Sequence, residues 1–352
     1  MGDLRVRHDS LREFVANVFT ALAVPEAGEI ADHLVLANLR GVDSHGVSRV
    51  GVYAERLEAG LVAKETRLKV LHETPVSALL DGGNGSGIVV AARAMEVAIR
   101  KAEESGMGAV SVRRSNHCGM LAYYTRRAAA RGLISLATTS APANMAPWGG
   151  AERFFGTNPL SYGVPTGEEY DIVFDMASSN VARGKIILAE KNGQRIPLGW
   201  ALDPDGRETT DPEDALKGLV QPLGGPKGSG IAFLVEVLSS ILSGANFGPH
   251  IPPLYDNPDE EQNVGHFFLA LRPDLFQPRH EFLERMDRLI REIRAVRPVP
   301  GVEEVLLPGE PELRKEKERR ENGIPLSREV FEEFTALASR YEIPDSLAAR
   351  QE

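Results

Sequence analysis

The sequence predicts an α/β fold with an all-helical unit at its start. Residues 9–60 carry apolar side chains at helical spacing, which indicates helices in this region. From residue 66 onward, short apolar runs typical of strands alternate with amphipathic helices, and this alternation predicts an α/β core with some parallel strand pairing. A chain of 352 residues is long enough for two domains, or for one large domain with an appendage.

The composition is ordinary for a soluble globular protein, with 42% hydrophobic and 26% charged residues. The net charge of −10 argues against general nucleic-acid binding, which needs a basic surface. Because Cys118 is the one cysteine, no intrachain disulfide can form, and we expect a reducing cytoplasm. The N-terminal segment lacks the apolar core of a signal peptide, and no apolar run reaches membrane-spanning length. We therefore expect a cytoplasmic protein without a nucleic-acid or membrane partner.

The helical unit is expected to begin with three helices. Residues 9–40 form two of them, and Gly41 ends the second. The third begins in the segment DSHGVSR at 43–49, because apolar residues recur at helical spacing after it. Asp43 or Ser44 is the candidate N-cap of this third helix.

The segment 43–49 also carries the first candidate site residues. A helix N-terminus favours anions and disfavours the imidazolium form of a nearby histidine, so we expect His45 to be close to neutral near pH 7. His45 and Arg49 are four residues apart and would share one face of a helix. An acid/base group beside a guanidinium that binds carboxylates bidentately suits a 2-hydroxy or 2-oxo acid substrate. Taken alone, the segment also fits a capped surface helix with an incidental histidine.

The α/β core is expected to follow directly. Its first predicted elements are strands at 68–71 and 76–80, a helix from 88 to 106, a strand at 109–112, a helix that ends at 131 and a strand at 134–139. The glycine-rich run at 81–87 has no Gly-x-Gly-x-x-Gly frame, because Ile88 stands where the third glycine belongs. We interpret this run as a tight connection between strand and helix.

The polar loop at 113–119 is the second candidate site, because loops at strand ends carry function more often than other segments. Asn116 and His117 are its candidate residues. A metal site is only weakly indicated, since one cysteine and scattered histidines lack ligand spacing. His117 and Cys118 are also poorly placed as a nucleophile pair, because adjacent side chains on a regular element point apart.

The glycine-rich loop at 221–230 is the third candidate. It contains Lys227 and precedes an apolar helix at 231–242, so a cation and a helix N-terminus come together as they do in anion sites. The loop does not match the Gly-x-x-x-x-Gly-Lys-Ser/Thr motif of P-loops.

The remaining segments complete the expected element order. We expect a structured loop system at 141–165, a strand at 172–176, a helix or turn from 182, a loop and candidate lid at 250–265, a strand at 266–271, a charged amphipathic helix at 281–297, a solvated mixed-charge helix at 312–320 and a last helix capped by Ser327.

Side by side, these segments resemble the type 2 malate/L-lactate dehydrogenase family, which also contains sulfolactate and ureidoglycolate dehydrogenases, diketogulonate reductases and piperideine-2-carboxylate reductases. The resemblance covers nearly the whole chain. It rests on motifs in the family's order: DSHGVSR at 43–49, SNHCG at 115–119, APWGG at 146–150, GTNPLSYGVP at 156–165, FDMASSNVARGK at 174–185, GGPKGSG at 224–230, GHFFLAL at 265–271 and LPGE at 307–310. Two positions depart from the pattern: Thr139 stands where many members have asparagine, and Arg272 where an acidic residue is more usual.

The resemblance implies an NAD- or NADP-dependent oxidoreductase without a Rossmann domain, in agreement with the missing glycine fingerprint. It implies a homodimer with its active site near the subunit interface. The implied architecture pairs a helical domain, built from residues 1–65 and 300–352, with an α/β cofactor domain of mixed sheet at 66–299.

The resemblance also implies roles for individual residues. His45 and His117 are the acid/base candidates, Arg49 would hold the substrate carboxylate, and Ser44 and Asn116 would orient the substrate oxygen. The residues implied to line the cofactor site are Ser140, Asp175, Met176, Ala177, Lys227, Gly309 and Glu310. No metal is expected.

The sequence thus predicts reversible hydride transfer between a nicotinamide and C2 of a small 2-hydroxy/2-oxo acid of the malate, lactate or sulfolactate type. Reduction of a cyclic imino acid such as piperideine-2-carboxylate would use the same carboxylate clamp and stays open here. A metal-dependent hydrolase built on His45, His117 and Cys118 is a more remote alternative, and an inactive cofactor-binding protein would be signalled by loss of the His45 and Arg49 pair. The choice between NAD and NADP, and between the two histidines as the proton-transfer residue, also stays open.

Overall fold

The computed structural model describes residues 4–255, 257, 259–344 and 347 of the chain. Its centre is a seven-stranded mixed sheet with the order β2-β3-β4-β11-β5-β6-β7. Within this sheet β3 and β4 pair in parallel, and the other neighbouring pairs are antiparallel. The strands are β2 (Lys69–Glu73), β3 (Ser77–Asp81), β4 (Met107–Ser115), β5 (Ile134–Thr139), β6 (Leu160–Val164), β7 (Ile172–Met176) and β11 (Val264–Leu271).

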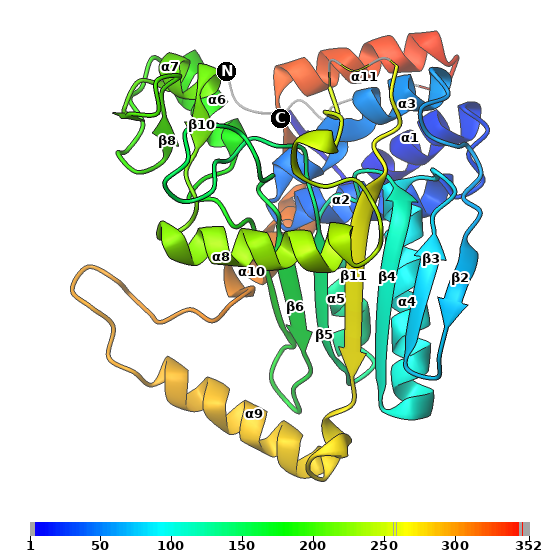
Figure 1. Ribbon diagram of the computed structural model, residues 1–352, viewed down its shortest axis with the longest axis vertical. Helices are drawn as coiled ribbons and strands as arrows, with labels where there is room; N and C mark the ends of the chain where they lie inside the picture. The colour runs from blue at the N-terminus through cyan, green and yellow to red at the C-terminus, as the bar shows by residue number, and fades with distance from the viewer. Residues whose placement is uncertain (1–3, 256, 258, 345–346, 348–352) are drawn as a thin grey trace.

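Helices cover both faces of the sheet (Figure 1). α4 (Gly87–Ser105) and α5 (Ala122–Ala129) pack on one face, while α8 (Pro226–Glu236) and the π-helical turn after it (Val237–Ile241) cross the other. The buried side chains of α4 follow the predicted helical spacing, and Gly106 ends this helix with a left-handed φ of +89°.

A helical unit lies against the edge of the sheet at which β3, β4 and β5 end (Figure 1). Its apolar side chains form one buried cluster in which Phe14 and Phe334 pack with ring centroids 4.9 Å apart. Strands β1 and β12 pair antiparallel, so segments from both ends of the chain meet in this unit. Its elements are β1 (Leu4–Val6), α1 (His8–Ala21), α2 (Ala27–Leu39), α3 (Val50–Glu58), β12 (Ile324–Leu326) and α11 (Arg328–Arg340).

The remaining elements are peripheral to the main sheet. A small sheet of β8 (Ala201–Leu202), β9 (Glu208–Thr209) and β10 (Leu219–Val220) packs with α6 (Arg183–Lys191) and α7 (Pro212–Lys217). α9 (Arg279–Arg294) extends from the edge opposite the helical unit (Figure 1), and α10 (Glu310–Asn322) brings the chain back to α2. Short 3₁₀ turns lie at Asp43–His45, Val47–Arg49, Gly248–His250 and Pro273–Leu275.

Two predictions about these elements need correction. The loop system expected at 141–165 contains a strand, β6, which pairs with both β5 and β7. The helix at 312–320 exists within α10, but it is not solvated all round, because Glu316 and Arg319 are buried in ion pairs. Their partners come from distant segments, and a charge pattern read along one helix cannot reveal such tertiary pairing.

Within the described ranges, no helix is both long enough and apolar enough to cross a membrane.

Candidate active site

The carboxyl ends of β3, β4, β5 and β7 meet at one edge of the sheet, because these four strands run in the same direction. His117 follows β4, Ser140 follows β5, and Asp175 lies at the end of β7. The fold therefore brings candidate residues from three separate segments to one edge, beside the helical unit (Figure 1). Ligand sites in α/β proteins commonly form at the carboxyl ends of strands.

The segment 43–49, which we call the 43–49 turn, consists of two 3₁₀ turns, and α3 begins only at Val50. The prediction that Asp43 or Ser44 caps a helix is therefore wrong. The two turns are separated by Gly46, whose backbone angles (φ −96°, ψ −146°) are not helical and interrupt the run. Gly46 also lies directly against Asn38, and a Cβ at this position would stand 2.0 Å from Asn38 Oδ1. The close packing explains why glycine occupies the centre of the turn.

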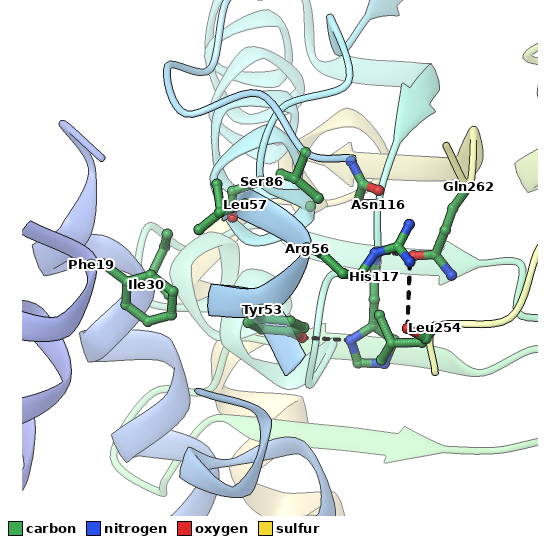
Figure 2. Close-up of a pocket in the computed structure, with 12 residues that line it drawn as sticks. Phe19, Ile30, Tyr53, Arg56, Leu57, Ser86, Asn116, His117, Leu254 and Gln262 are labelled. Carbon is green, nitrogen blue, oxygen red and sulfur yellow. Dashed lines mark hydrogen bonds between the residues drawn. The ribbon is translucent and has the colours of Figure 1, made fainter. Parts of the chain in front are cut away.

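The two candidate histidines lie side by side, one in the 43–49 turn and one after β4. The ring centroids of His45 and His117 are 5.5 Å apart, and the ring planes are inclined by 20°. His117 Nδ1 is hydrogen-bonded to the Tyr53 hydroxyl at 2.6 Å (Figure 2), and His45 Nδ1 is hydrogen-bonded to Ser44 Oγ at 2.9 Å. Each imidazole is thus held at Nδ1, and Nε2 is the nitrogen left to transfer a proton.

Burial keeps both imidazoles in the neutral form near pH 7. Burial, and then the charge of Arg49, lower the pKa of His45 to about 4. The pKa of His117 is also lowered well below the ordinary value, by burial first and then by electrostatic interaction with His45 and Arg49. The prediction that His45 is close to neutral therefore holds, but the cause is desolvation and a neighbouring cation instead of a helix N-terminus.

Arg49 lies next to both histidines, and its guanidinium already has two partners. Nε donates a hydrogen bond to the Ser44 carbonyl at 2.7 Å, and Nη1 donates to the Tyr255 hydroxyl. The Tyr255 ring centroid is 5.2 Å from the guanidinium carbon. Because Nε is bound to the backbone, a substrate carboxylate would meet the Nη1 and Nη2 edge of the fork.

Asn116 ties the loop after β4 to the glycine-rich connection between β3 and α4. Its amide nitrogen donates to Asn84 Oδ1 and to the Gly85 carbonyl, each at 2.9 Å. Gly87 lies so close to this loop that a Cβ would stand 2.1 Å from the Asn116 carbonyl oxygen. The run at 81–87 thus connects strand and helix tightly, and it supports the backbone that carries His117. Among the described residues no partner is found for the buried Asn116 Oδ1.

A small cavity lies beside His117, between the helical unit and the loop after β4 (Figure 2). Tyr53 and His117 point toward one another at its wall. The other side chains that line it include Phe19, Ile30, Leu57 and Asn116.

The segments that carry the candidate cofactor residues after β5 and β7 are both hydrogen-bonded, through their backbone N–H groups, to the turn at 156–159. Ala141 N, next to Ser140, donates to Asn158 Oδ1 at 3.3 Å, and Ser178 N, next to Ala177, donates to the Thr157 carbonyl at 2.8 Å. The two strand ends and the turn at 156–159 therefore form one continuous rim. On this rim Asp175 Oδ2 accepts a hydrogen bond from Ala122 N at 2.7 Å, and burial raises the pKa of Asp175 to about 6.

Lys227 lies where the loop at 221–225, which continues this rim, meets the start of α8. Leu223 N donates to the Ser178 carbonyl at 2.9 Å, which fixes the loop beside the end of β7. Lys227 is exposed in the first turn of α8, and the loop before it turns through Gly224 and Gly225, which have positive φ. Trp148 packs against Gly225, so the motif at 146–150 joins the same region. An exposed cation at a helix N-terminus is suited to bind an anionic group.

Gly309 and Glu310 lie at the start of α10, where Gly309 packs against the outer edge of β7. A Cβ at Gly309 would stand 2.0 Å from the Val173 carbonyl oxygen. The Glu310 carboxylate accepts hydrogen bonds from the Tyr170 hydroxyl at 2.7 Å and from Arg314 at 2.6 Å. Glu310 is thus engaged in a network of its own, and its place in the cofactor site stays a prediction.

Three residues of this region, named below, were not predicted from the sequence. Tyr53 had a usable signal, because His45, Arg49 and Tyr53 recur every fourth residue. Tyr255 lies in a Pro-rich loop without periodicity, and Arg319 lies in a mixed-charge helix, so neither had a local signal. Among the described residues, no group of three or more histidine, cysteine, aspartate or glutamate side chains is arranged to hold a metal ion.

Comparison with known proteins gives a consistent result. The profile of a family described as malate/L-lactate dehydrogenase matches residues 6–335. A malate dehydrogenase of Pyrococcus horikoshii is 38% identical over 347 residues, which is 96% of this chain and 95% of that protein. The solved structure of a sulfolactate dehydrogenase from Methanocaldococcus jannaschii superposes with a TM-score of 0.91 at 36% identity, covering 96% of this chain and 98% of that one. A Δ1-piperideine-2-carboxylate reductase from Pseudomonas syringae superposes with a TM-score of 0.85 at 28% identity, covering 95% and 99%.

Proposed function

This chain belongs to the malate/L-lactate dehydrogenase family, and from that premise we propose that it transfers a hydride reversibly between NAD or NADP and C2 of a small 2-hydroxy or 2-oxo acid. The observation that carries the proposal is the meeting of His45, His117 and Arg49 at the carboxyl edge of the sheet. Two neutral imidazoles beside a guanidinium offer a proton-transfer group and a carboxylate clamp within one site.

Each residue has a defined task in this proposal. Arg49 binds the substrate carboxylate through its Nη1 and Nη2 edge, and Ser44 and Asn116 orient the oxygen on C2. His117 takes the hydroxyl proton at Nε2 during oxidation and returns it during reduction. For this step Nδ1 must carry its own proton, and the Tyr53 oxygen at 2.6 Å is placed to accept it. Tyr53 is therefore a positioning residue that selects the working tautomer of His117.

The bound nicotinamide would supply the hydride donor and acceptor. We propose that Ser140, Asp175, Met176, Ala177, Lys227, Gly309 and Glu310 line its site. The fit rests on the continuous rim from β5 to α8, and on the exposed Lys227 at a helix N-terminus, which would hold a phosphate of the cofactor. The sheet has a single parallel pair among its described neighbours, which supports a cofactor domain of non-Rossmann type at 66–299.

A second candidate activity is reduction of a cyclic imino acid. The observation that favours it is the likeness to a Δ1-piperideine-2-carboxylate reductase over almost the whole of both chains. Such a substrate also carries a carboxylate next to the carbon that receives the hydride, so the same clamp would serve.

The test is a substrate panel with the purified protein. Pyruvate, oxaloacetate, sulfopyruvate and piperideine-2-carboxylate are each offered with NADH and with NADPH, and the nicotinamide absorbance is followed. We expect turnover of at least one 2-oxo acid. Turnover of the imine alone would select the second activity, and no turnover with any pair would contradict the proposal.

Replacing Tyr53 by Phe should lower kcat about 10- to 100-fold and leave KM nearly unchanged, because the hydroxyl orients His117 and does not bind substrate. Steady-state kinetics in the directions of oxidation and reduction measure kcat and KM separately. Tyr341 offers a matched control, since its hydroxyl bonds Glu58 in the helical unit at 3.0 Å, away from the histidines. If Tyr53→Phe and Tyr341→Phe change kcat by the same factor, the positioning role of Tyr53 is wrong.

We also propose that residues 1–65 and 300–352 form the helical domain and that the protein is a homodimer. The first part is supported by the shared apolar cluster of α1, α2, α3 and α11. The second is supported by the outward face of α8, where Phe233 is 61% and Leu234 is 56% exposed, so that two large apolar side chains lie open where a second subunit could cover them. Sedimentation equilibrium should give twice the chain mass, and a monomer at micromolar concentration would contradict the dimer.

A further inference from the structure

The 43–49 turn carries Arg49, the proposed carboxylate clamp, and His45, which stacks against the proposed proton-transfer residue His117, yet the turn has no regular helix of its own. Two side-chain contacts hold it from within the helical unit. Asn38 Oδ1 accepts a hydrogen bond from Val47 N at 2.7 Å, and Asn38 Nδ2 donates to Asp43 Oδ1 at 2.6 Å. Within the turn, Ser48 Oγ donates to the Asp43 carbonyl at 3.0 Å. The position of Asp43 therefore affects both halves of the turn.

A third contact reaches the turn from the other end of the chain. Arg319 on α10 binds Asp43 through both arms of its guanidinium, with Nη1 2.6 Å from Oδ1 and Nη2 3.1 Å from Oδ2. Nη1 also donates to the Asn38 carbonyl. Arg319 thus binds Asp43 and the end of α2 together. Its planar guanidinium makes two parallel hydrogen bonds to the Asp43 carboxylate, which a lysine ammonium group cannot reproduce.

Arg319 itself is held on a fixed support. One turn earlier on α10, the buried Glu316 pairs with Arg40 at the end of α2 and with Arg126 on α5, each at 3.3 Å. α10 is therefore fastened to both the helical unit and the helix that follows His117 along the chain. A side chain on so constrained a helix can define the place of a turn that has no regular helix of its own.

The balance of energies suggests that this contact matters more for geometry than for stability. The Arg319 side chain is 10% exposed, but the Asp43 side chain is 50% exposed, and ion pairs open to water contribute little to folding. A displacement of catalytic groups by about 1 Å, in contrast, can reduce turnover about 100-fold.

We propose that Arg319 is a positioning residue that sets the 43–49 turn through Asp43, and so aligns His45 and Arg49 with His117. The inference rests on the proposed function for its kinetic effect, and on the geometry alone for the placement of His45. Ser44 and His45 follow Asp43 directly in the chain, so release of Asp43 shifts them first.

The test compares Arg319→Gln, Asp43→Asn and the double variant with Arg320→Gln. Arg320 is the matched control, because it lies next along α10 and pairs with Glu316 at 2.8 Å without bonding the turn. We expect Arg319→Gln to lower kcat about 10- to 100-fold, with KM for the nucleotide within about twofold of the wild type. Arg319→Lys should recover part of the loss, and it replaces the glutamine variant if that protein does not fold. Because Arg319 acts through Asp43, the double variant should be no worse than the worse single variant.

A second readout keeps the inference testable without turnover. The imidazole NMR signals of His45 should move in Arg319→Gln and stay in place in Arg320→Gln. Equal effects of the two variants on kinetics and NMR, or additive losses in the double variant, would overturn the positioning role. If the wild type turns over no acid with either nucleotide, the proposed function fails, and the NMR comparison still decides the role of Arg319.

Discussion

Arg49→Lys should lower kcat/KM for a 2-oxo acid about 10- to 100-fold, mostly through a higher KM. The guanidinium presents two parallel donors to a carboxylate, whereas an ammonium group presents a point charge and loses one charge-assisted hydrogen bond. Lysine also has a methylene where arginine has Nε, so the hydrogen bond from Nε to the Ser44 carbonyl, which shapes the turn, is lost. Steady-state kinetics on the acid that the panel identifies measure both constants.

Arg328→Lys is the appropriate control for this variant. Arg328 pairs with Glu332 on the exposed side of α11 and is remote from the histidine pair in the chain and in its contacts. Thermal unfolding of both variants separates a local effect from a loss of fold. Full catalytic efficiency of Arg49→Lys would show that the carboxylate is bound elsewhere. Tyr255 belongs to the same geometry, because Arg49 Nη1 donates a hydrogen bond to its hydroxyl and would also donate to the substrate carboxylate.

Local periodicity was sufficient to predict most of the fold. The helix at 88–106 and the strands at 134–139 and 172–176 agree closely with α4, β5 and β7, because each has a long regular pattern and a clear end signal. The failed glycine fingerprint also led to the correct interpretation of the run at 81–87 as a connection, which the close approach of Gly87 to Asn116 explains.

The start of the 43–49 turn could not be predicted by the same reasoning. Asp43 and Ser44 have the composition of an N-cap, but Asp43 is captured by Arg319, which lies 276 residues further along the chain. Gly46 then interrupts the helix because Asn38 occupies the space of its missing side chain. Both causes are tertiary contacts, so a pattern read along one segment does not contain them.

In the candidate site, too, local sequence patterns indicate the residues, whereas tertiary contacts determine their environment. The motifs indicated His45, Arg49 and His117 as candidates because these residues are chemically distinctive, and the structure brings the three together, while their catalytic roles stay a prediction. Neither the Tyr53 contact to His117 nor the desolvation that lowers both histidine pKa values follows from spacing, because both depend on how the helical unit packs on the sheet edge. The class of activity was thus easier to predict than the contacts that set the pKa values and the orientation of the histidines.

His117→Gln should abolish most proton transfer and lower kcat about 10²- to 10⁴-fold in both directions. His45→Gln should cost much less, because the Nδ1 of His117 is held by Tyr53 in a part-buried contact, while the Nδ1 of His45 meets the exposed Ser44. The two variants therefore choose between histidines that the sequence left equivalent. A larger loss in His45→Gln would reverse the assignment.

The pH dependence gives an independent measurement of the same assignment. Oxidation needs the neutral imidazole, and the pKa of His117 lies below the ordinary value of 6.5 in the folded protein. For the wild type, kcat/KM for the 2-hydroxy acid should therefore be constant from pH 8 to 6.5 and should fall at lower pH, as the imidazole takes up a proton. Reduction needs the protonated form, so its kcat/KM should rise in the same range. The fall of kcat/KM below pH 6.5 should be absent in His117→Gln and present in His45→Gln. This result would identify His117 as the residue that transfers the proton.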